Sequence, residues 1–455
     1  MDFVSNQEAQ IADMLAVIGI SRVEELFTAI PEKLRLAKPT LDDGLSEYEG
    51  LCFMEDLASK NTFQRFENYL GAGAYEHHVP ALVGAICAKS EFLTAYTPYQ
   101  AEISQGMLQV IFEFQSAICA LTGLDVSNAS LYDGASACAE GLLMALRLQK
   151  RTKIVVAGTL HPHYRAVVKQ YLDCHDVHIE EIPFESNGKV DLKKMDTLFD
   201  GDTAAVLIQS PNFFGVIEDV SAISQRAKEK GILTVLCANP LAYGIYASAA
   251  ELGADIAVGD CQPLGLPLQY GGPYVGYIAC RQEYVRQMPG RIVGETVDTE
   301  GNRGFVLTLQ AREQHIRREK ATSNICTNQA LAALASLVAI LWYGKEGMRK
   351  LALTNFQRTS YLKAELAKLS GLTLLTGDLP LFNEFAVKFS LPINEVQAYF
   401  REQKIEPGLD LGRYYPNSPA LKGYMLVCVT ETKSKKQLDR FIEVAQKLSN
   451  LERKK

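Results

Sequence analysis

The chain has 455 residues, of which 47% are hydrophobic and 22% are charged, and its net charge is −7. This length exceeds the roughly 250–300 residues at which a single core stops growing, so we expect two domains plus an arm. The acidic balance, without a basic stripe, argues against nucleic-acid binding. The N-terminus lacks the basic and apolar regions of a signal peptide, and no apolar run reaches about 18 residues, so we expect a cytoplasmic protein without membrane contact.

Ten cysteines and seven histidines are spread along the chain. The cysteines form no CxxC pair, which favours reduced, mostly buried thiols over a disulfide framework or a zinc site. The histidines show no HExxH spacing, so we expect no catalytic metal.

Residues 1–65 are predicted to form a helical arm. Two capping-box patterns, Ser5–Glu8 and Ser21–Glu24, introduce short helices. After the first pattern, apolar residues recur at the spacing of one helix face, at Ile11, Met14, Leu15 and Ile18. Such helices expose too much apolar surface to stand alone, so we expect the arm to pack on the main body or on a partner.

Residues 66–345 are predicted to form a large α/β domain. Short β-branched runs alternate with helical stretches, which is typical of a mostly parallel sheet covered on both faces. The predicted strands cover residues 153–157, 177–182, 204–209, 232–237, 255–258 and 274–278, and a helix follows over residues 328–342. This pattern resembles the large domain of aminotransferase-like proteins, the fold type I of pyridoxal-phosphate enzymes.

Residues 346–455 are predicted to form a smaller α+β domain. Its strands are expected over residues 385–389 and 425–429, and its last helix over residues 435–448. We expect the domain boundary near Gly344 and Gly347.

A long segment without lysine lies in the predicted large domain. No lysine occurs between Lys230 and Lys320, and the gap covers residues 254–273, where an aminotransferase-like enzyme carries the lysine that binds pyridoxal phosphate. Gln262 stands roughly in the place of that lysine. Without an amine here no Schiff base forms, so another polypeptide must complete the chemistry, or the chemistry does not occur.

Several residues lie where such a fold holds the rest of the cofactor. Small and hydroxyl residues precede a predicted helix, whose free amides and dipole favour an anion such as the cofactor phosphate; an N-cap without a ligand is the alternative. Asn239 stands where related enzymes have an aspartate against the pyridine nitrogen, and His161 either stacks on an aromatic ligand or caps a turn. The resulting candidates for a vestigial pocket are Ser130, Asp133, Gly134, Ala135, Ser136, His161, Asn239 and Gln262.

The segment 92–106 is unusually polar for an aromatic turn. Tyr96 and Tyr99 flank Pro98, which holds the loop open so that both hydroxyls can project. Glu102 and Gln105 add polar groups before the next helix. A glycine-rich loop over residues 71–80 ends near His77 and His78, which are further candidates for the same cleft.

These segments carry a family resemblance. Five of them closely resemble the P protein of the glycine cleavage system, or glycine decarboxylase: residues 71–80, 92–106, 128–135, 209–215 and 253–273. The resemblance covers essentially the whole chain and is to the N-terminal half of that protein, which in many bacteria is a separate subunit 1. The segment 92–106 is its most specific part.

The resemblance implies a function. In this family, glycine reacts with pyridoxal phosphate held covalently by the lysine of the homologous subunit 2, loses CO2, and passes its aminomethyl group to the lipoyl arm of the H protein. The lysine-free subunit shares the partner's fold, forms a heterotetramer with it and adds residues to the active site across the interface. By this resemblance the catalytic candidates are Tyr96, Tyr99, Glu102 and Gln105, with His77 and His78 as further ones.

Two other hypotheses remain at this point. The first is that the chain is a non-catalytic scaffold or regulatory pseudo-enzyme of the same fold. The second is that it is a self-sufficient lyase that uses a distant lysine such as Lys320. The lysine gap disfavours the second of these.

Overall fold

The computed structural model describes residues 6–36 and 41–452, and the chain divides into a unit of residues 1–63 and a unit of residues 64–455. The first unit holds two α-helices, α1 (Glu8–Ile18) and α2 (Glu47–Ser59), and two 3₁₀ turns, η1 (Val23–Phe27) and η2 (Glu32–Leu34). None of its described residues is buried. These helices therefore have no core of their own.

The predicted caps of the arm are partly wrong. Ser5 lies outside the described residues, and α1 begins after Gln7, whose amide donates to the Gln10 side chain. Ser21 does form a hydrogen bond with a glutamate, but with Glu25 rather than Glu24. The segment that follows is a short 3₁₀ helix rather than an α-helix.

The unit of residues 64–455 is built on a seven-stranded sheet with the order β2-β8-β7-β6-β5-β3-β4. Strands β4, β3, β5, β6 and β7 are parallel, whereas β8 is antiparallel to β7 and to β2. The bounds are β2 (Val126–Ser127), β3 (Lys153–Ala157), β4 (His178–Ile182), β5 (Thr203–Gln209), β6 (Leu233–Cys237), β7 (Ile256–Asp260) and β8 (Gly276–Cys280). The mostly parallel sheet that we expected is present.

Helices cover both faces of this sheet, which explains why its central strands are continuous apolar runs. One face packs against α6 (Gly134–Gln149) and α7 (Pro162–Leu172). The other face packs against α5 (Gln105–Thr122), α8 (Leu192–Leu198), α9 (Val220–Glu229) and the start of α11 (Ala330–Ala367). A hairpin of β9 (Ile292–Val297) and β10 (Arg303–Thr308) packs against α5.

A four-stranded antiparallel sheet forms the rest of this unit. Its order is β11-β12-β15-β14, with β11 (Leu372–Leu374), β12 (Glu384–Phe389), β14 (Leu409–Asp410) and β15 (Tyr424–Cys428). It shares a core with α12 (Ile393–Glu402), α14 (Lys435–Glu452) and the second half of α11. The short elements are η3 (Phe63–Arg65), β1 (Glu67–Asn68), α3 (Ala81–Cys87), α4 (Ser90–Leu93), η4 (Pro240–Gly244), η5 (Gln282–Gln287), η6 (Gln310–Arg312), α10 (Gln314–Arg317), η7 (Arg318–Lys320), β13 (Ile405–Glu406), α13 (Leu411–Tyr414) and η8 (Pro419–Leu421).

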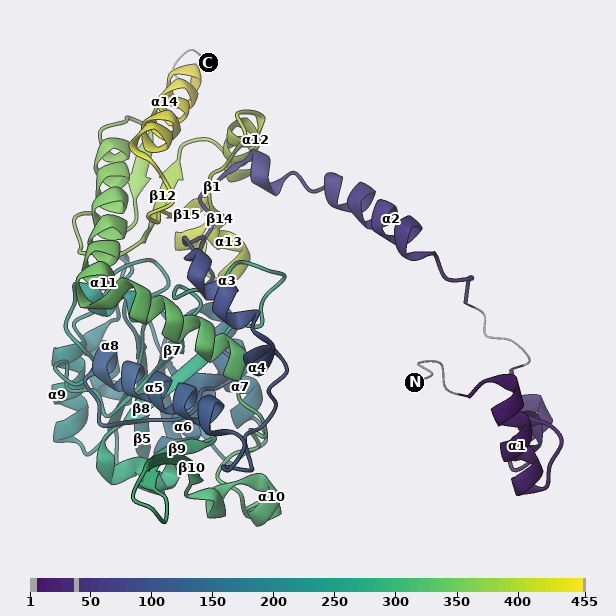
Figure 1. Ribbon diagram of the computed structural model, residues 1–455. Helices are drawn as coiled ribbons and strands as arrows, with labels where there is room; N and C mark the ends of the chain where they lie inside the picture. The colour runs from purple at the N-terminus through teal and green to yellow at the C-terminus, as the bar shows by residue number, and fades with distance from the viewer. Residues whose placement is uncertain (1–5, 37–40, 453–455) are drawn as a thin grey trace. The chain divides into compact units, whose positions relative to one another are not determined.

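Helix α11 connects the two sheets. It is longer than the predicted helix over residues 328–342 and contains a non-helical residue, Gly344, at φ 57°. Figure 1 shows its first half running along the large sheet and its second half along the small one. Among the described residues it is the one helix long and apolar enough to cross a membrane, yet 44% of its most apolar window is buried inside the protein. Ala333, Leu334 and Leu337 lie in the core, as expected for a core helix.

Candidate functional site

Gln262 follows β7 at the carboxyl end of the large sheet, where the parallel strands of such folds present their functional groups. Its side chain is fully buried and all of its amide groups are used. Oε1 accepts from the Tyr75 amide at 2.8 Å, and Nε2 donates to the Tyr75 carbonyl at 2.8 Å and to the Leu266 carbonyl at 3.1 Å. Gln262 therefore fastens the loop of residues 71–80 to the end of β7 as a strand partner would.

The N-terminus of α6, a candidate phosphate site, is occupied by two carboxylates of the chain itself. Asp133 caps the helix and accepts from the Ser136 amide at 2.7 Å, and Asp260 accepts from the Gly134 amide at 3.0 Å. Burial, with the charge of Asp133 acting in the same direction, raises the pKa of Asp260 to about 7. A phosphate here would meet both carboxylates instead of free amides. The structure shows the N-cap, formed by Asp133.

Ser130 and Ala135 do not face a ligand either. Ser130 is buried with φ 118°, and its Oγ accepts from the Gln329 amide at 3.1 Å and from Asn328 Nδ2 at 3.3 Å. It thus fastens the start of α11. Ala135 is buried in the first turn of α6.

His161 both stacks and caps. Its ring lies 4.8 Å from the Tyr164 ring with 27° between the planes. Nδ1 accepts from the His163 amide at 3.1 Å, so that His161 caps α7, and Nε2 faces the Ala72 carbonyl at 2.7 Å and carries the proton. Burial lowers the pKa of His161 to about 4, so the ring is neutral. The stacking partner is thus a tyrosine of the chain.

Asn239 caps η4 through Oδ1, which accepts from the Leu241 amide at 3.0 Å, while its buried Nδ2 has no hydrogen-bond partner among the described residues. The cavity beside it measures about 30 Å³ and is lined by Gly73, Tyr75, His161, Tyr164, Gln209, Cys237, Ala238, Asn239, Asp260 and Pro263. Such a space holds about one or two water molecules. The residues present do not fit pyridoxal phosphate, because they offer neither an amine nor a phosphate cup nor room.

The predicted site residues did not include Tyr164 and Asp260, which line this cavity, or Glu384, which bonds to the lining residue Tyr75. Tyr164 lies one helical turn after His161, and Asp260 ends β7, so both spacings contained a local signal. Glu384 comes from β12 and had none, because its Oε1 and Oε2 accept from the distant Ala72 amide at 2.6 Å and Tyr75 hydroxyl at 2.9 Å. Burial raises the pKa of Glu384 to about 7.

His77 and His78 lie in the contact between the loop of residues 71–80 and the segment after β15. His77 Nδ1 lies 2.8 Å from Glu431 Oε2, and the His78 amide donates to Glu431 Oε1 at 2.7 Å. Although burial opposes it, these bonds lower the pKa of Glu431 to about 2. The side chain of His78 is exposed, and His77 Nε2 is buried without a hydrogen-bond partner in the described part of the chain.

The loop of residues 94–104 lies against the β9–β10 hairpin. Tyr96 is 80% exposed and Tyr99 is 50% exposed, whereas Pro98 between them is buried. Glu102 is exposed and, like Tyr96, makes no hydrogen bond or ion pair within the described residues. Gln105 exchanges two bonds with the Phe305 backbone, at 2.8 and 2.9 Å. The tyrosines are therefore presented outward, and Gln105 holds their loop.

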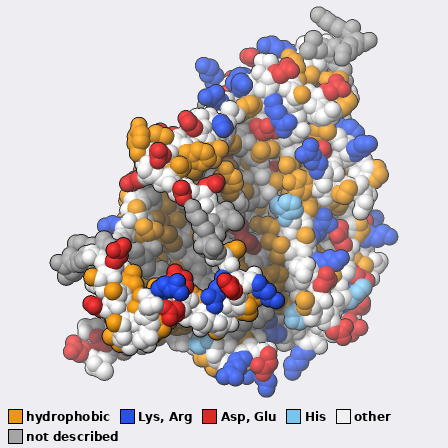
Figure 2. Space-filling view, turned by 90° about the vertical axis from the view of Figure 1, so that its right-hand side faces the viewer, with side chains coloured by type: hydrophobic (Ala, Val, Ile, Leu, Met, Phe, Trp, Pro, Cys, Tyr) orange, Lys and Arg blue, Asp and Glu red, His pale blue; other side chains and the backbone are white. Residues whose placement is uncertain are grey.

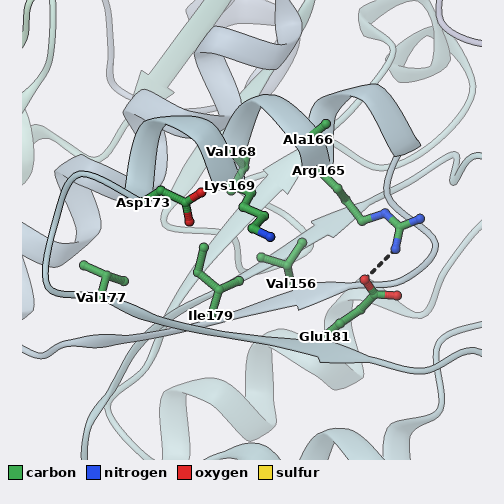
Figure 3. Close-up of a pocket in the computed structure, with 9 residues that line it drawn as sticks. All are labelled: Val156, Arg165, Ala166, Val168, Lys169, Asp173, Val177, Ile179 and Glu181. Atoms are coloured by element: carbon green, nitrogen blue, oxygen red, sulfur yellow. Dashed lines mark ion pairs between the residues drawn. The ribbon is translucent and has the colours of Figure 1, made fainter.

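The larger hollows of the surface do not coincide with these groups. Figure 3 shows a groove between α7 and the edge strand β4, where Arg165 and Glu181 pair with each other. The volume of this groove is about 460 Å³. Figure 2 shows one face of the molecule, with basic and acidic side chains interspersed among hydrophobic ones.

Within the described residues, no group of three His, Cys, Asp or Glu side chains could hold a metal ion. Lys320 is exposed in η7 and does not line the cavity beside Asn239.

Comparison with known proteins identifies the family of this chain. A model of the glycine cleavage system P-protein family matches residues 1–445. The chain belongs to the P-protein family. A P-protein relative from Protochlamydia amoebophila, named as probable glycine dehydrogenase (decarboxylating) subunit 1, is 62% identical over 98% of this chain and 100% of its own length. One with the same name from Desulforamulus reducens is 50% identical over 96% and 98%.

Solved structures agree with the assignment to the P-protein family. A crystal structure of glycine decarboxylase (P-protein) in inhibitor-bound form has a TM-score of 0.90 and 39% identity, covering 98% of this chain and 100% of that one. A NifS-like protein, 14% identical with a TM-score of 0.64 over 85% of this chain and all of its own, shares the fold alone. The expected aminotransferase-like fold type I is thereby confirmed.

Proposed function

We propose that this chain is the lysine-free subunit of glycine decarboxylase. In this proposal a homologous subunit 2 holds pyridoxal phosphate on its lysine, and the pair decarboxylates glycine and passes the aminomethyl group to the lipoyl arm of an H protein. The observation that carries the proposal is Gln262. In a chain of this family, the place of the catalytic lysine holds a fully buried amide that is bonded to the Tyr75 backbone.

The filled pocket supports the location of the cofactor on the partner. Asp260 and Asp133 accept from the Gly134 and Ser136 amides, two of the amides at the start of α6 that a phosphate would use. When it is bound on the partner, pyridoxal phosphate supplies an electron sink for the charge left by the departing carboxylate. This chain then contributes structure and side chains, not the sink.

We place the contribution of this chain in the loop of residues 94–104. Tyr96, Tyr99 and Glu102 are presented on the surface, where they can reach a site on another subunit. Gln105 holds the loop on β10 and has no free amide group for catalysis. His77 stabilises the loop of residues 71–80 through Glu431, and we assign His78 the same role through its backbone.

Exposed apolar side chains support an obligate partner. Leu82 on α3, Leu93 on α4, and Leu341 and Trp342 on α11 are each at least 40% exposed. Helix α11 packs against α3, and α3 against α4, so these side chains lie on neighbouring elements. Covering such a surface stabilises a complex, and we propose a cytoplasmic heterotetramer of two subunits of each kind.

Reconstitution tests the proposal. The purified chain, its subunit 2, a lipoylated H protein and pyridoxal phosphate are combined, and glycine-dependent exchange of labelled bicarbonate into glycine is measured. We expect exchange only when both subunits are present, and borohydride should trap the cofactor on subunit 2 alone. Trapping on this chain, or full exchange by subunit 2 without it, would refute the proposal and favour the lyase or the scaffold hypothesis respectively.

A further inference from the structure

Arg291 links the interior of the chain to the exposed Tyr99. Its side chain is only 5% exposed, and Nη2 donates to the Tyr99 hydroxyl oxygen at 2.7 Å. The guanidinium carbon lies 5.0 Å from the centre of the Tyr99 ring, which places the cation over the aromatic face. Because a guanidinium only donates, the phenolic oxygen is the acceptor, and the hydroxyl proton must point to another group.

The backbone that carries Arg291 is held from two sides. Arg312 donates to the Met288 carbonyl and, at 3.2 Å, to the Gly290 carbonyl. The Ala129 amide donates to the Arg291 carbonyl at 2.8 Å. These bonds hold the backbone of Arg291 in place, and the backbone in turn restricts the position of the guanidinium. The guanidinium therefore determines where the Tyr99 hydroxyl lies.

The hydrogen-bond donors of the Arg291 guanidinium are only partly satisfied by the described residues around it. Glu313, itself buried, lies 3.4 Å from Nε, but Nε and Nη1 have no hydrogen-bond partner among the described residues. His315 lies 3.6 Å from the same carboxylate and edge-on to the Tyr99 ring, with 5.7 Å between ring centres. Arg312, by contrast, donates to the carbonyls of Leu309, Met288 and Gly290. Among the described residues, the one hydrogen bond of the Arg291 guanidinium goes to the Tyr99 hydroxyl.

We propose that Arg291 is a positioning residue for the glycine decarboxylase reaction, which fixes the Tyr99 hydroxyl as an outward hydrogen-bond donor to the partner's active site. The inference rests on the proposed function of Tyr99. Glu313 balances the buried charge, and His315 limits rotation of the ring from its edge. Arg291 itself stays too buried to touch the substrate.

A double-mutant cycle tests this in the reconstituted complex with saturating H protein. Arg291→Met should lower kcat by tenfold or more with a much smaller change in the KM for glycine, and Arg291→Lys, which keeps a donor, should recover part of the loss. In a Tyr99→Phe background the Arg291→Met change should have no further effect on kcat, because the hydroxyl that it positions is gone. Arg303→Met is the matched control, since Arg303 stacks on Phe305 of the same hairpin but is exposed; its kcat should equal that of the wild type.

A second readout does not depend on catalysis. In the isolated subunit with fluorotyrosine, the ¹⁹F line of Tyr99, assigned by its loss in Tyr99→Phe, should shift in Arg291→Met and Arg291→Lys but not in Arg303→Met. An unchanged line, or losses that multiply in the double mutant, would overturn the positioning role while leaving the proposed function intact. Wild-type exchange by Tyr99→Phe would overturn the proposed role of Tyr99 and this inference with it.

Discussion

Tyr96 and Tyr99 sit on the same loop but are held differently. Tyr99 is fixed by Arg291, whereas Tyr96 is free of hydrogen bonds within the described residues. Removing one preorganised hydroxyl from a water-poor site lowers a rate by about 10²–10³, so we expect a loss of that size in Tyr99→Phe. Because no described residue holds the Tyr96 hydroxyl, we expect a smaller loss in Tyr96→Phe. Glycine–bicarbonate exchange by the reconstituted complex measures it. Assembly, followed by size-exclusion chromatography, should be unchanged.

The control for this prediction is Tyr48→Phe, which removes a hydroxyl from an exposed tyrosine on α2. If Tyr96→Phe and Tyr99→Phe both turn over at the control rate, the loop is scaffolding. The chain would then be better described as a pseudo-enzyme that supports its partner.

Gln262→Lys should not create a cofactor site. The change removes the acceptor of the Tyr75 amide, and one amide left unpaired costs about 1–3 kcal/mol of unfolding free energy. It also buries an ammonium at a position that is 0% exposed, which adds to that cost. The N-terminus of α6 stays closed by Asp133 and Asp260. We expect a lower urea midpoint and no absorbance band near about 420 nm with added pyridoxal phosphate. A band at that wavelength, with decarboxylation by the variant alone, would contradict this account.

The fastening of the loop of residues 71–75 to strand β12 predicts a pH dependence of stability. Burial raises the pKa of Glu384 from 4.5 to about 7, so the folded state holds the proton more tightly than the unfolded state. The stability contributed by this group is complete below about pH 4.5 and is lost as the pH rises through about 7, a change of about 3 kcal/mol. Asp260 and Glu218 change stability in the same direction.

Glu384→Gln tests this contribution, because the amide can keep both bonds, accepting from the Ala72 amide and donating to the Tyr75 oxygen. Urea unfolding of the wild type should show a falling free energy between pH 5 and about 7.5, and the variant should show a fall smaller by about 3 kcal/mol. Glu395→Gln, at an exposed position of α12, is the control and should follow the wild type. Identical curves for Glu384→Gln and the wild type would show that Glu384 ionises normally.

The elements that the sequence predicted best are those with the strongest local pattern. The apolar runs at residues 204–209 and 232–237 lie within one residue of β5 and β6, because strands covered on both faces carry no polar alternation. Helix α11 was underpredicted, since Gly344 and Gly347 mark a change of direction rather than an end. A kinked helix and two helices have the same local sequence, and only tertiary packing separates them.

The same contrast holds for the candidate site. Gln262 and Asn239 were recognisable because each follows a strand at the position where such folds carry a specific residue. The sequence left open whether α6 begins with a phosphate site or with an N-cap, and Asp260, which binds the Gly134 amide there, lies 126 residues further along the chain. Glu384 and Glu431 reach the loop of residues 71–80 from more than 300 residues away. Contacts at that separation leave no trace in local spacing.

For the whole molecule, we predict that the isolated chain exposes apolar surface that a partner subunit would bury. No described residue of the unit 1–63 is buried, and the exposed side chains of this unit include Val17, Leu26, Phe27, Phe53 and Leu57. An obligate interface buries over about 2,000 Å² of largely apolar surface, so the isolated chain should bind a hydrophobic dye or self-associate. Sedimentation velocity at several concentrations checks this. A clean monomer at high concentration without dye binding would contradict the need for a partner.

A truncation separates the arm from the rest. The unit of residues 64–455 has hydrophobic cores of its own, so we expect it to unfold in a cooperative thermal transition after residues 1–63 are removed. The truncated chain should pair with subunit 2 more weakly, as seen by co-purification at dilute concentration. Undiminished pairing would exclude the arm from the interface.

On the proposed function, the carboxylates at the start of α6 also affect how a limited supply of cofactor is shared. Asp133 and Asp260 compete with a phosphate from within the same chain, at a high effective concentration, so we expect an excess of this chain to withhold no pyridoxal phosphate from other enzymes. Titration of the assembled complex should therefore end at one cofactor for every two polypeptides. A cell can make this subunit first, or in surplus, without depleting the coenzyme on which its partner depends.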